Sequence, residues 1–418
     1  MIANRIRAWV QRAGVGGGGG FARLICVICM LLLLSGCWDL RYLDKLGVVY
    51  AVGIDPDPSG KQELQLTVQV VLPQNVASES KGSGGGPTVT TFTETGDTVF
   101  EAIRKMSTKT SRRLFFSHTQ MLIISEAMAR RGVYPLVDLI ERNPDIRTDM
   151  QIALTRGTSA RKLLQTTTQM ESIPVNQLRE MIEVNEEAYA NNYATYVKDI
   201  TRLAGKGGEQ GVIPSLRIEG DKSAGNKADN ITSIPAEAVP SLASMGVLKD
   251  GKLVGFLTSK QSRGLAWLKD KVKNTVVKVA CPESEGYLTV EVQNAKRLYK
   301  VKQSGDGKPI IEVELLLTGG IQEIMCPGVK VMEESVLEQI GELASQTVKS
   351  EAEEAIRVLQ KDIRSDALGW GKEIYMHKPS IWKRVEAEWD TEFSSVQSNI
   401  RCKTKISSSG IRSESIVE

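Results

Sequence analysis

The last third of the chain constrains the fold most, because long strand-like segments are followed there by one long amphipathic helix. TVVKVAC, YLTVEVQNAKRLYKVK and PIIEVELLLTGGIQEIM predict successive strands, with SGDGKP as the turn between the last two. The helical pattern runs from Val331 to Ser365. Its apolar positions include Val336, Ile340, Leu343, Val348, Ala352, Ile356 and Leu359. KPSIWKRVEAEWDTEF predicts a second helix and SNIRCKTKIS a closing strand. One antiparallel sheet covered by a long helix is the expected result.

The first part of the chain alternates between strand-like and helical segments. GVVYAVGID and LQLTVQVVL predict two strands joined by the turn-forming DPDPSGK. After a Gly- and Ser-rich loop at 78–87, TVTTFTE, LFFSHTQMLIIS and MQIALTRG predict three more strands. VFEAIRKMSTKTSRR and AMARRGVYPLVDLIERN predict helices between them. This alternation predicts an α/β domain of one sheet and one helical layer.

A change of composition separates a middle region from the first part. Residues 205–238 are rich in Gly, Asn, Lys, Ser and Pro, and VIPSLRIEG predicts a strand within them. SMGVLKDGKLVGFL predicts a hairpin around Asp250-Gly251, and SKQSRGLAWLKDKV predicts an amphipathic helix. The predicted fold class is α+β (mixed α/β), with three domains in series, each a mostly antiparallel sheet covered by helices. The predicted limits are 37–180 for the N-terminal α/β domain, 181–274 for the small middle α/β domain with its linker, 275–410 for the C-terminal α+β domain and 411–418 for a tail.

Residues 31–38 read LLLLSGCW and close an apolar run of 11 residues, Leu24–Leu34. A membrane-spanning helix needs roughly 20 apolar residues, so this run suits the core of an export signal instead. Four arginines and no acidic residue precede Cys37, which favours export of the remainder. The segment Leu34-Ser35-Gly36-Cys37 resembles the bacterial lipobox, in which the thiol receives a diacylglyceryl group and the chain is cut before the cysteine. We therefore predict a lipoprotein signal peptide at 1–36 and lipidation at Cys37. The alternative is a short membrane anchor with Cys37 as one more apolar residue.

Removing the signal peptide changes what the composition implies. It would leave 382 of the 418 residues, and losing four arginines would change the formal net charge from +3 to −1. A near-neutral chain argues against nucleic-acid binding, which requires a concentrated basic footprint. A diacylglyceryl anchor supplies two acyl chains, enough for stable attachment to membrane lipid. We therefore expect an exported body that is tethered through Cys37.

Three cysteines remain in the body once the signal peptide and Cys37 are set aside. Cys26 and Cys29 lie within the apolar run and would leave with it, so their C-x-x-C spacing carries no redox meaning. Cys281 and Cys326 each precede a proline where a strand-like run ends. In an oxidising compartment we hypothesise a Cys281–Cys326 disulfide. The alternative is three free, mostly buried thiols, Cys402 included.

The sequence contains no recognisable catalytic or metal-binding motif. His118 and His377 are the only histidines, and neither belongs to a cluster with zinc-ligand spacing. We expect His118 to be partly buried within a strand. Gly246–Lys252 has the G-x-x-x-x-G-K spacing, but Leu253 replaces the required Ser or Thr and the segment predicts a hairpin. We therefore predict no catalytic residue, no metal and no cofactor, and we identify no ligand-binding residue.

An ordered set of short motifs resembles one known family, the C-subunit lipoproteins of bacterial spore germinant receptors (GerAC or Ger(x)C). At the start of the mature chain the matching residues are Gly36-Cys37-Trp38-Asp39, Arg41, Leu43 and Gly53-Ile54-Asp55. Farther along they are Ser117-His118, Gly132, Gly255-Phe256, Gly264-Leu265 and Trp267-Leu268. Near the end they are DALGWG at 366–371, Lys378-Pro379, Trp382 and Trp389.

This resemblance implies a role beside two integral-membrane subunits in a receptor that responds to small nutrients. It implies three α/β domains in series, no enzymatic activity, and a location on the outer face of the cell membrane, which in a spore is the inner membrane. Only Cys37 carries over as a functional residue, as the lipidated position. Two alternatives are a lipid-anchored extracytoplasmic protein that binds a small molecule directly, and a cell-wall hydrolase that uses two carboxylates.

Overall fold

The computed structural model describes residues 45–79, 86–205, 207–282, 284–327, 329, 331 and 333–408, with Val27 alone before them. The chain divides into two compact units, 1–46 and 47–418, and the second is the subject here. Within the described part, no helix is both long enough and apolar enough to cross a membrane. Cys37 and the 411–418 tail lie outside the described residues.

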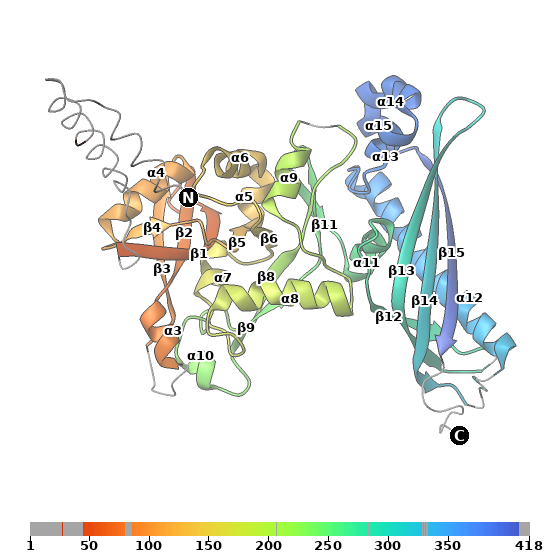
Figure 1. The fold of residues 1–418 in the computed structure, drawn as a ribbon, viewed down its shortest axis with the longest axis horizontal. Coiled ribbons are helices and arrows are strands. Elements are labelled where there is room, and N and C mark those ends of the chain that lie inside the picture. The colour runs from red at the N-terminus through yellow and green to blue at the C-terminus, as the bar shows by residue number, and fades with distance from the viewer. Residues whose placement is uncertain are drawn as a thin grey trace, which may run out of the picture. The chain divides into compact units, whose positions relative to one another are not determined.

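The first sheet contains eight strands in the order β3-β2-β1-β5-β6-β8-β9, with β4 paired to β1 (Figure 1). Its strands are β1 (Leu46–Pro56), β2 (Leu64–Val71), β3 (Val89–Gly96), β4 (Arg113–Phe115), β5 (Met121–Ile124), β6 (Gln151–Thr155), β8 (Ser215–Gly220) and β9 (Ala238–Leu242). The central pairs β1–β5, β5–β6 and β6–β8 are parallel, whereas β1–β2, β2–β3 and β8–β9 are antiparallel. The first sheet is therefore mixed, not mostly antiparallel as expected, because helices connect its central strands.

Helices cover both faces of this sheet, where the sequence predicted one helical layer. Val52 and Ile54 of β1 pack into a core shared with α4 (Val99–Lys105), α5 (Glu126–Arg131), α6 (Tyr134–Arg142) and α9 (Val197–Leu203). Ala51 points to the other face, into a core with α7 (Ala160–Gln165) and α8 (Pro174–Ala188). A continuous apolar run such as GVVYAVGID is what a strand buried on both faces requires. The remaining elements are α3 (Pro73–Glu79), the 3₁₀ turn Met106–Thr108 and α10 (Asp229–Thr232).

A small three-stranded sheet follows, in the order β11-β10-β7. It consists of β7 (Val212–Ile213), β10 (Gly246–Lys249) and β11 (Lys252–Phe256), and α11 (Ser259–Leu268) comes next. Asp250 and Gly251 both have positive φ, 50° and 75°, as a tight hairpin turn requires, so the predicted hairpin is present. Ile213 and Leu248 pack into the first sheet's core, while Val212 and Val247 pack into the C-terminal core. This sheet thus lies between two cores.

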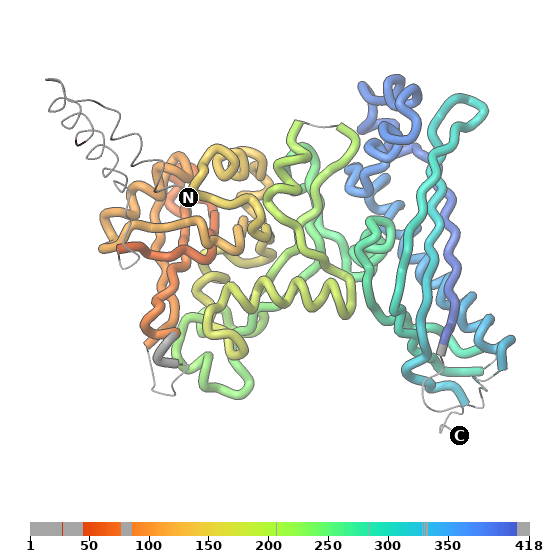
Figure 2. Tube along the Cα trace, viewed as in Figure 1, coloured from red at the N-terminus to blue at the C-terminus, as the bar shows by residue number. Residues whose placement is uncertain are grey.

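The C-terminal sheet has four strands in the order β12-β13-β14-β15. They are β12 (Thr275–Ala280), β13 (Tyr287–Gln303), β14 (Pro309–Met325) and β15 (Gln397–Ser408), and the tube in Figure 2 shows the long β13–β14 hairpin. Helix α12 (Glu334–Arg357) packs against the sheet through Ile340, Ala344 and Val348 and ends in a π-helical turn, Val358–Ile363. β15 runs parallel to β14, which corrects the predicted antiparallel arrangement. The crossover contains α12, α13 (Trp370–His377), α14 (Pro379–Val385), a 3₁₀ turn (Glu386–Glu388) and α15 (Trp389–Phe393).

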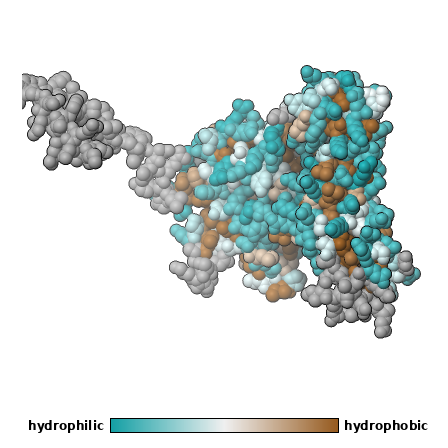
Figure 3. Space-filling view, turned by 45° about the vertical axis from the view of Figure 1, so that its right-hand side comes forward, coloured by the Kyte–Doolittle hydropathy of each residue, from teal (hydrophilic) through white to brown (hydrophobic). Residues whose placement is uncertain are grey.

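Two segments differ from what the sequence pattern predicted. LFFSHTQMLIIS is not one strand, because a turn after Phe115 separates β4 from β5 and leaves His118 exposed. VIPSLRIEG divides at Pro214 between β7 and β8, which belong to different sheets. The limit predicted at residue 180 lies within α8, and the one at 274 lies between α11 and β12; as domain boundaries both stay predictions. The face of the described residues seen in Figure 3 is largely hydrophilic, with separate hydrophobic patches.

Candidate functional site

The predicted chemical site, Cys37, lies outside the described residues, so its lipidation stays a prediction. The two histidines are found in different elements: His118 stacks edge-on against Phe115, and His377 ends α13 with its Nδ1 2.9 Å from the Glu373 carbonyl oxygen. Among the described residues, no group of three or more His, Cys, Asp or Glu side chains could hold a metal ion.

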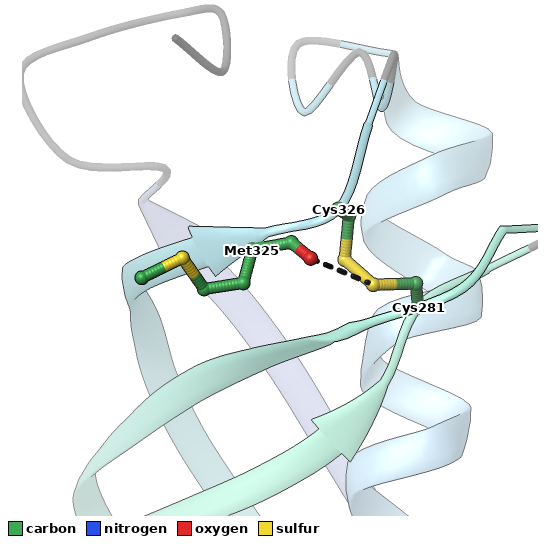
Figure 4. Close-up of a disulfide and its surroundings, with 3 residues drawn as sticks. All are labelled: Cys281, Met325 and Cys326. Carbon is green, nitrogen blue, oxygen red and sulfur yellow. Dashed lines mark hydrogen bonds between the residues drawn. A yellow bond between two sulfur atoms is a disulfide. The ribbon is translucent and has the colours of Figure 1, made fainter. Parts of the chain in front are cut away.

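The structure joins Cys281 and Cys326 by a disulfide, with 5.7 Å between their Cα atoms (Figure 4). Cys281 follows β12 and Cys326 follows β14, while β13 lies between these strands. The bond therefore ties two strands that are not neighbours, across the first residues of β13. Gly286 passes so close that a Cβ there would lie 2.0 Å from the Met325 carbonyl oxygen. The remaining thiol, Cys402, is partly buried, and burial raises its pKa to about 11, so it is a poor nucleophile.

We predict that the double substitution Cys281→Ser and Cys326→Ser lowers the free energy of unfolding by about 2–5 kcal/mol. The reason is that the bond closes a loop of 45 residues and so restricts the unfolded chain. Urea titration followed by circular dichroism measures the change, with Cys402→Ser as the control that leaves the bond intact. Mass spectrometry of the non-reduced protein gives an independent check, since alkylation of both Cys281 and Cys326 would contradict the bond.

A cavity of about 700 Å³ opens at the carboxyl ends of β1 and β5. β1 and β5 are neighbours in the sheet, but the chain continues from β1 to β2 on one side and from β5 to β6 on the other side. Such a reversal of strand order is where open α/β sheets commonly bind ligands. The residues around the cavity include Asp55, Ser125, Arg130, Gly157, Arg161 and Lys162.

Asp55 at the end of β1 fixes the position of α7, whose first residues line the cavity. Its carboxylate accepts the backbone N–H groups of Ala160 and Arg161, both at 2.9 Å, and so caps the first turn of α7. Burial raises the pKa of Asp55, while those two N–H groups act in the opposite direction. Asp55 already uses the N–H groups of α7, and Arg130 is paired with Glu126 at 2.8 Å. A ligand would therefore depend on the side chains of Arg161 and Lys162.

A second cavity, of about 410 Å³, lies at the opposite end of the same strands. Its charged side chains are largely paired with one another: Arg179 contacts Glu183 at 2.8 Å, and Gln151 Nε2 donates to the same carboxylate at 2.8 Å. Arg147 Nε donates to Asp149 at 2.9 Å. These pairs leave few charges for a ligand, so this cavity is the weaker candidate.

A buried carboxylate, Asp366, organises the segment 364–371, which we call the junction segment. Asp366 Oδ1 accepts the N–H groups of Gly369 and Trp370 at 2.8 and 3.0 Å. Its Oδ2 accepts the N–H of Gly371 at 2.8 Å and the indole N–H of Trp389 at 3.0 Å. Burial raises the pKa of Asp366 to about 6, while these donors, Gly371 first, act to lower it.

The junction segment also connects the small sheet to the C-terminal helices. The N–H of Gln210 donates to the Asp366 carbonyl oxygen at 2.9 Å, and Ser365 Oγ donates to the Leu248 carbonyl oxygen at 2.6 Å. Glu209 accepts Lys269 at 2.5 Å and Lys372 at 3.2 Å. Burial alone would raise the pKa of Glu209, but the two lysines lower it. The segment therefore acts as a polar clamp between two parts of the fold.

A second buried carboxylate, Glu351 of α12, joins α11 to α12. It forms a two-point ion pair with Arg263, whose Nε lies 2.9 Å from Oε2, and it accepts the indole N–H of Trp267 at 3.1 Å. The Glu351 side chain is 3% exposed and that of Arg263 is 12% exposed. Gly264 allows this close approach, because a Cβ there would lie 2.1 Å from the Glu351 carbonyl oxygen.

These buried polar centres were not predicted from the sequence, although residues beside them belong to the motifs that carry the family resemblance. Trp267, Trp382 and Trp389 are among those motif residues, and all three are buried. Asp366 belongs to the DALGWG motif, in which Gly369 has a positive φ of 76° and lets the backbone turn sharply. The three N–H donors of a Gly-Trp-Gly turn are a signal that an acidic residue just before it could cap them. Glu351 carried no comparable signal, since it lies among many exposed acidic residues of the same helix.

Three sheets and buried polar clamps define an α+β protein whose charged centres hold its elements together. Residues 39–218 match the family model described as spore germination protein N-terminal domain. Residues 243–410 match the model described as spore germination B3/GerAC like, C-terminal. The chain belongs to the GerAC family of spore germination proteins, and its role is in spore germination.

Individual proteins are similar over nearly the whole chain. Spore germination protein KC of Bacillus subtilis (strain 168) is 27% identical over 403 residues, covering 94% of this chain and 97% of that protein. Spore germination protein B3 of the same strain is 23% identical, covering 87% of this chain and 91% of that protein. The crystal structure of the GerBC protein matches 88% of this chain and 100% of its own, with a TM-score of 0.53 and 17% identity. That likeness confirms the α+β fold.

Proposed function

We propose that this chain is a non-catalytic, lipid-anchored subunit of a germinant receptor that acts with integral-membrane partner subunits. The observation that carries the proposal is where the family match begins: at residue 39, two residues after the cysteine of the lipobox-like segment. The region that matches the family and the predicted mature chain thus start at nearly the same place. In this proposal Cys37 attaches the chain to membrane lipid on the outer face of the cell membrane, which in the spore is the inner membrane.

The anchor would act by raising the local concentration of the chain beside its membrane partners. A tethered body meets its membrane partners as if they were in one molecule, so weak contacts gain from a high effective concentration. Such a mechanism needs no catalytic group. The buried carboxylates Asp55, Glu351 and Asp366 all serve internal contacts, which agrees with a scaffold that presents surfaces to partners.

The test is Cys37→Ala. We expect the protein to stay folded but to move from the membrane fraction to the soluble fraction, and nutrient-triggered germination to weaken because about a hundredfold or more of effective concentration is lost. Cys29→Ala is the matched control, since it changes a cysteine of the apolar run without touching the lipobox-like segment. Full germination by spores in which the Cys37→Ala protein is soluble would refute the anchoring mechanism.

The cavity at the carboxyl ends of β1 and β5 favours a second candidate function, direct capture of a small polar molecule. Arg161 and Lys162 would provide the cationic side of such a site, with Arg130 beside them paired to Glu126. Calorimetry of the protein with candidate nutrients tests it, with Arg161→Ala against Arg202→Ala, an arginine in α9 that does not line the cavity. Binding that weakens only in Arg161→Ala would support capture, and no heat with any nutrient would dismiss it.

A further inference from the structure

The two faces of the C-terminal sheet are chemically different. One face is apolar and packs into the core, through Val301, Ile311, Val313, Leu315 and Ile400. Along β13, β14 and β15, the alternate residues that point to the other face are exposed or half-buried. A sheet that covers a core with one face and meets solvent with the other normally shows mixed polar residues there.

Here the solvent face is strongly cationic instead. Six exposed basic residues, which we call the basic face, are Lys296, Lys300, Lys302, Arg401, Lys403 and Lys405. The pairing register places Lys296, Leu316 and Lys403 in one row and Leu298, Glu314 and Arg401 in the next.

Two carboxylates, Glu312 and Glu314, lie among these six residues, so the net charge of this part of the face is +4, six minus two. Glu291 and Glu323 lie on the same side of the sheet, nearer the disulfide end. Among the described residues, the one ion pair of this face joins Lys302 Nζ to Glu312 at 2.8 Å. Most of the positive charge is therefore not neutralised within the protein, although the mature chain as a whole is predicted to be near neutral.

We propose that the basic face rests on the anionic phospholipid headgroups of the membrane to which the chain is attached. The cations lie on β13 and β15, on either side of β14, so the line of cations along β13 is about 10 Å from the line along β15. Five of the six are lysines, which act as point charges and do not need the paired geometry that arginine provides for a specific carboxylate. Neither cavity described above includes these residues. An extended, shallow set of point charges complements a continuous anionic surface.

The aliphatic residues between the cations suit the same partner. Leu316 and Ile310 of β14 lie on this face between the basic residues of β13 and β15. Leu298 lies between Lys296 and Lys300 on β13. Long lysine stems can cover apolar surface while their charged ends reach a polar layer. Attraction to an anionic leaflet extends only about one Debye length, roughly 10 Å at moderate salt, so it needs a membrane that is already close. The proposal therefore rests on the lipid anchor of the proposed function.

The experiment uses the lipidated full-length protein bound to vesicles of phosphatidylcholine, with or without phosphatidylglycerol. Lysines are acetylated briefly and the modification of each is measured by mass spectrometry. We expect Lys296, Lys300, Lys403 and Lys405 to be modified about tenfold more slowly on the anionic vesicles, and the difference to disappear at high salt. Lys349 on α12 is the internal reference, because it is exposed and lies on the helix that covers the opposite face.

A charge-reversed variant gives a second measurement. Arg401→Glu, Lys403→Glu and Lys405→Glu together should remove the protection of Lys296 and Lys300, whereas Lys105→Glu, Lys109→Glu and Arg130→Glu should not. Equal modification on both kinds of vesicle, with the protein still bound, would overturn the basic-face proposal but not the anchor. Protein that floats free of both vesicles would instead refute the anchor. Protection that appears only when membrane-protein partners are added to phosphatidylcholine vesicles would assign the face to an acidic protein and overturn the lipid proposal.

Discussion

Replacing Asp366 by alanine is expected to lower the free energy of unfolding by roughly 3 kcal/mol or more. The carboxylate accepts four N–H groups, three from the backbone of residues 369–371 and one from the Trp389 indole. All four donors would lose their acceptor in a site that excludes water, and an unsatisfied buried donor costs more than the hydrogen bond itself contributed. Urea unfolding followed by tryptophan fluorescence suits the measurement, because Trp370 and Trp389 both contact this site.

Asp362→Ala is the matched control for Asp366→Ala. Asp362 is four residues away and exposed, and its ion pair with Arg357 is at the surface, so its loss should change stability by less than about 1 kcal/mol. The loss of unfolding free energy in Asp366→Asn should lie between those of the two alanine variants, because an amide oxygen can still accept some of the four N–H groups. If Asp366→Ala and Asp362→Ala unfold at the same urea concentration, the junction segment is not the clamp described here.

Glu351→Ala is expected to lower the free energy of unfolding by about 3–5 kcal/mol. The substitution would leave the Arg263 guanidinium, 12% exposed, without its carboxylate, and would leave the Trp267 indole N–H without an acceptor. Removing one partner of a buried ion pair is costly because the other charge stays desolvated. Thermal and urea unfolding of the variant, compared with the unmodified chain, provide the measurement.

Glu353→Ala is the control within the same helix. Glu353 is exposed and pairs with Lys349 at 3.7 Å, so we expect a change of about 0.5 kcal/mol or less. The double variant Glu351→Met, Arg263→Met should be more stable than Glu351→Ala, because no unpaired charge remains buried. A double variant less stable than the single one would show that packing around the pair, not its charge, determines the loss.

The elements that could be predicted from the sequence are those with strong local signals. The long β13–β14 hairpin has alternating residues and a Gly-Asp-Gly turn, and the structure places the turn where Ser304 N donates to the Lys308 carbonyl oxygen. The Asp250-Gly251 turn predicts the hairpin of β10 and β11, and the helical periodicity of the apolar residues predicts α12. Gly264 differs from these elements: it belongs to the motifs that resemble the family, but its role depends on the close approach of α12, which no local signal shows.

What could not be predicted depends on contacts between distant residues. Nothing within LFFSHTQMLIIS shows that Met121–Ile124 pairs in parallel with β1, or that β15 would lie parallel to β14. The cavity beside Asp55 exists only because that pairing places β1 and β5 together. The basic face likewise follows from register: Lys296 and Lys403 are separated by more than a hundred residues, yet both are neighbours of Leu316.

The bond between Cys281 and Cys326 also determines how the chain would carry a mechanical load. A protein held to a membrane at its N-terminal end and to partners elsewhere can experience tension along its backbone. Force that enters at Cys281 would pass through the two sulfur atoms directly to Cys326, bypassing the 45-residue separation between them. The hairpin of β13 and β14, which lies entirely between the two cysteines, would then bear none of that force along its backbone. Its solvent face would therefore keep its register while the rest of the chain is stretched.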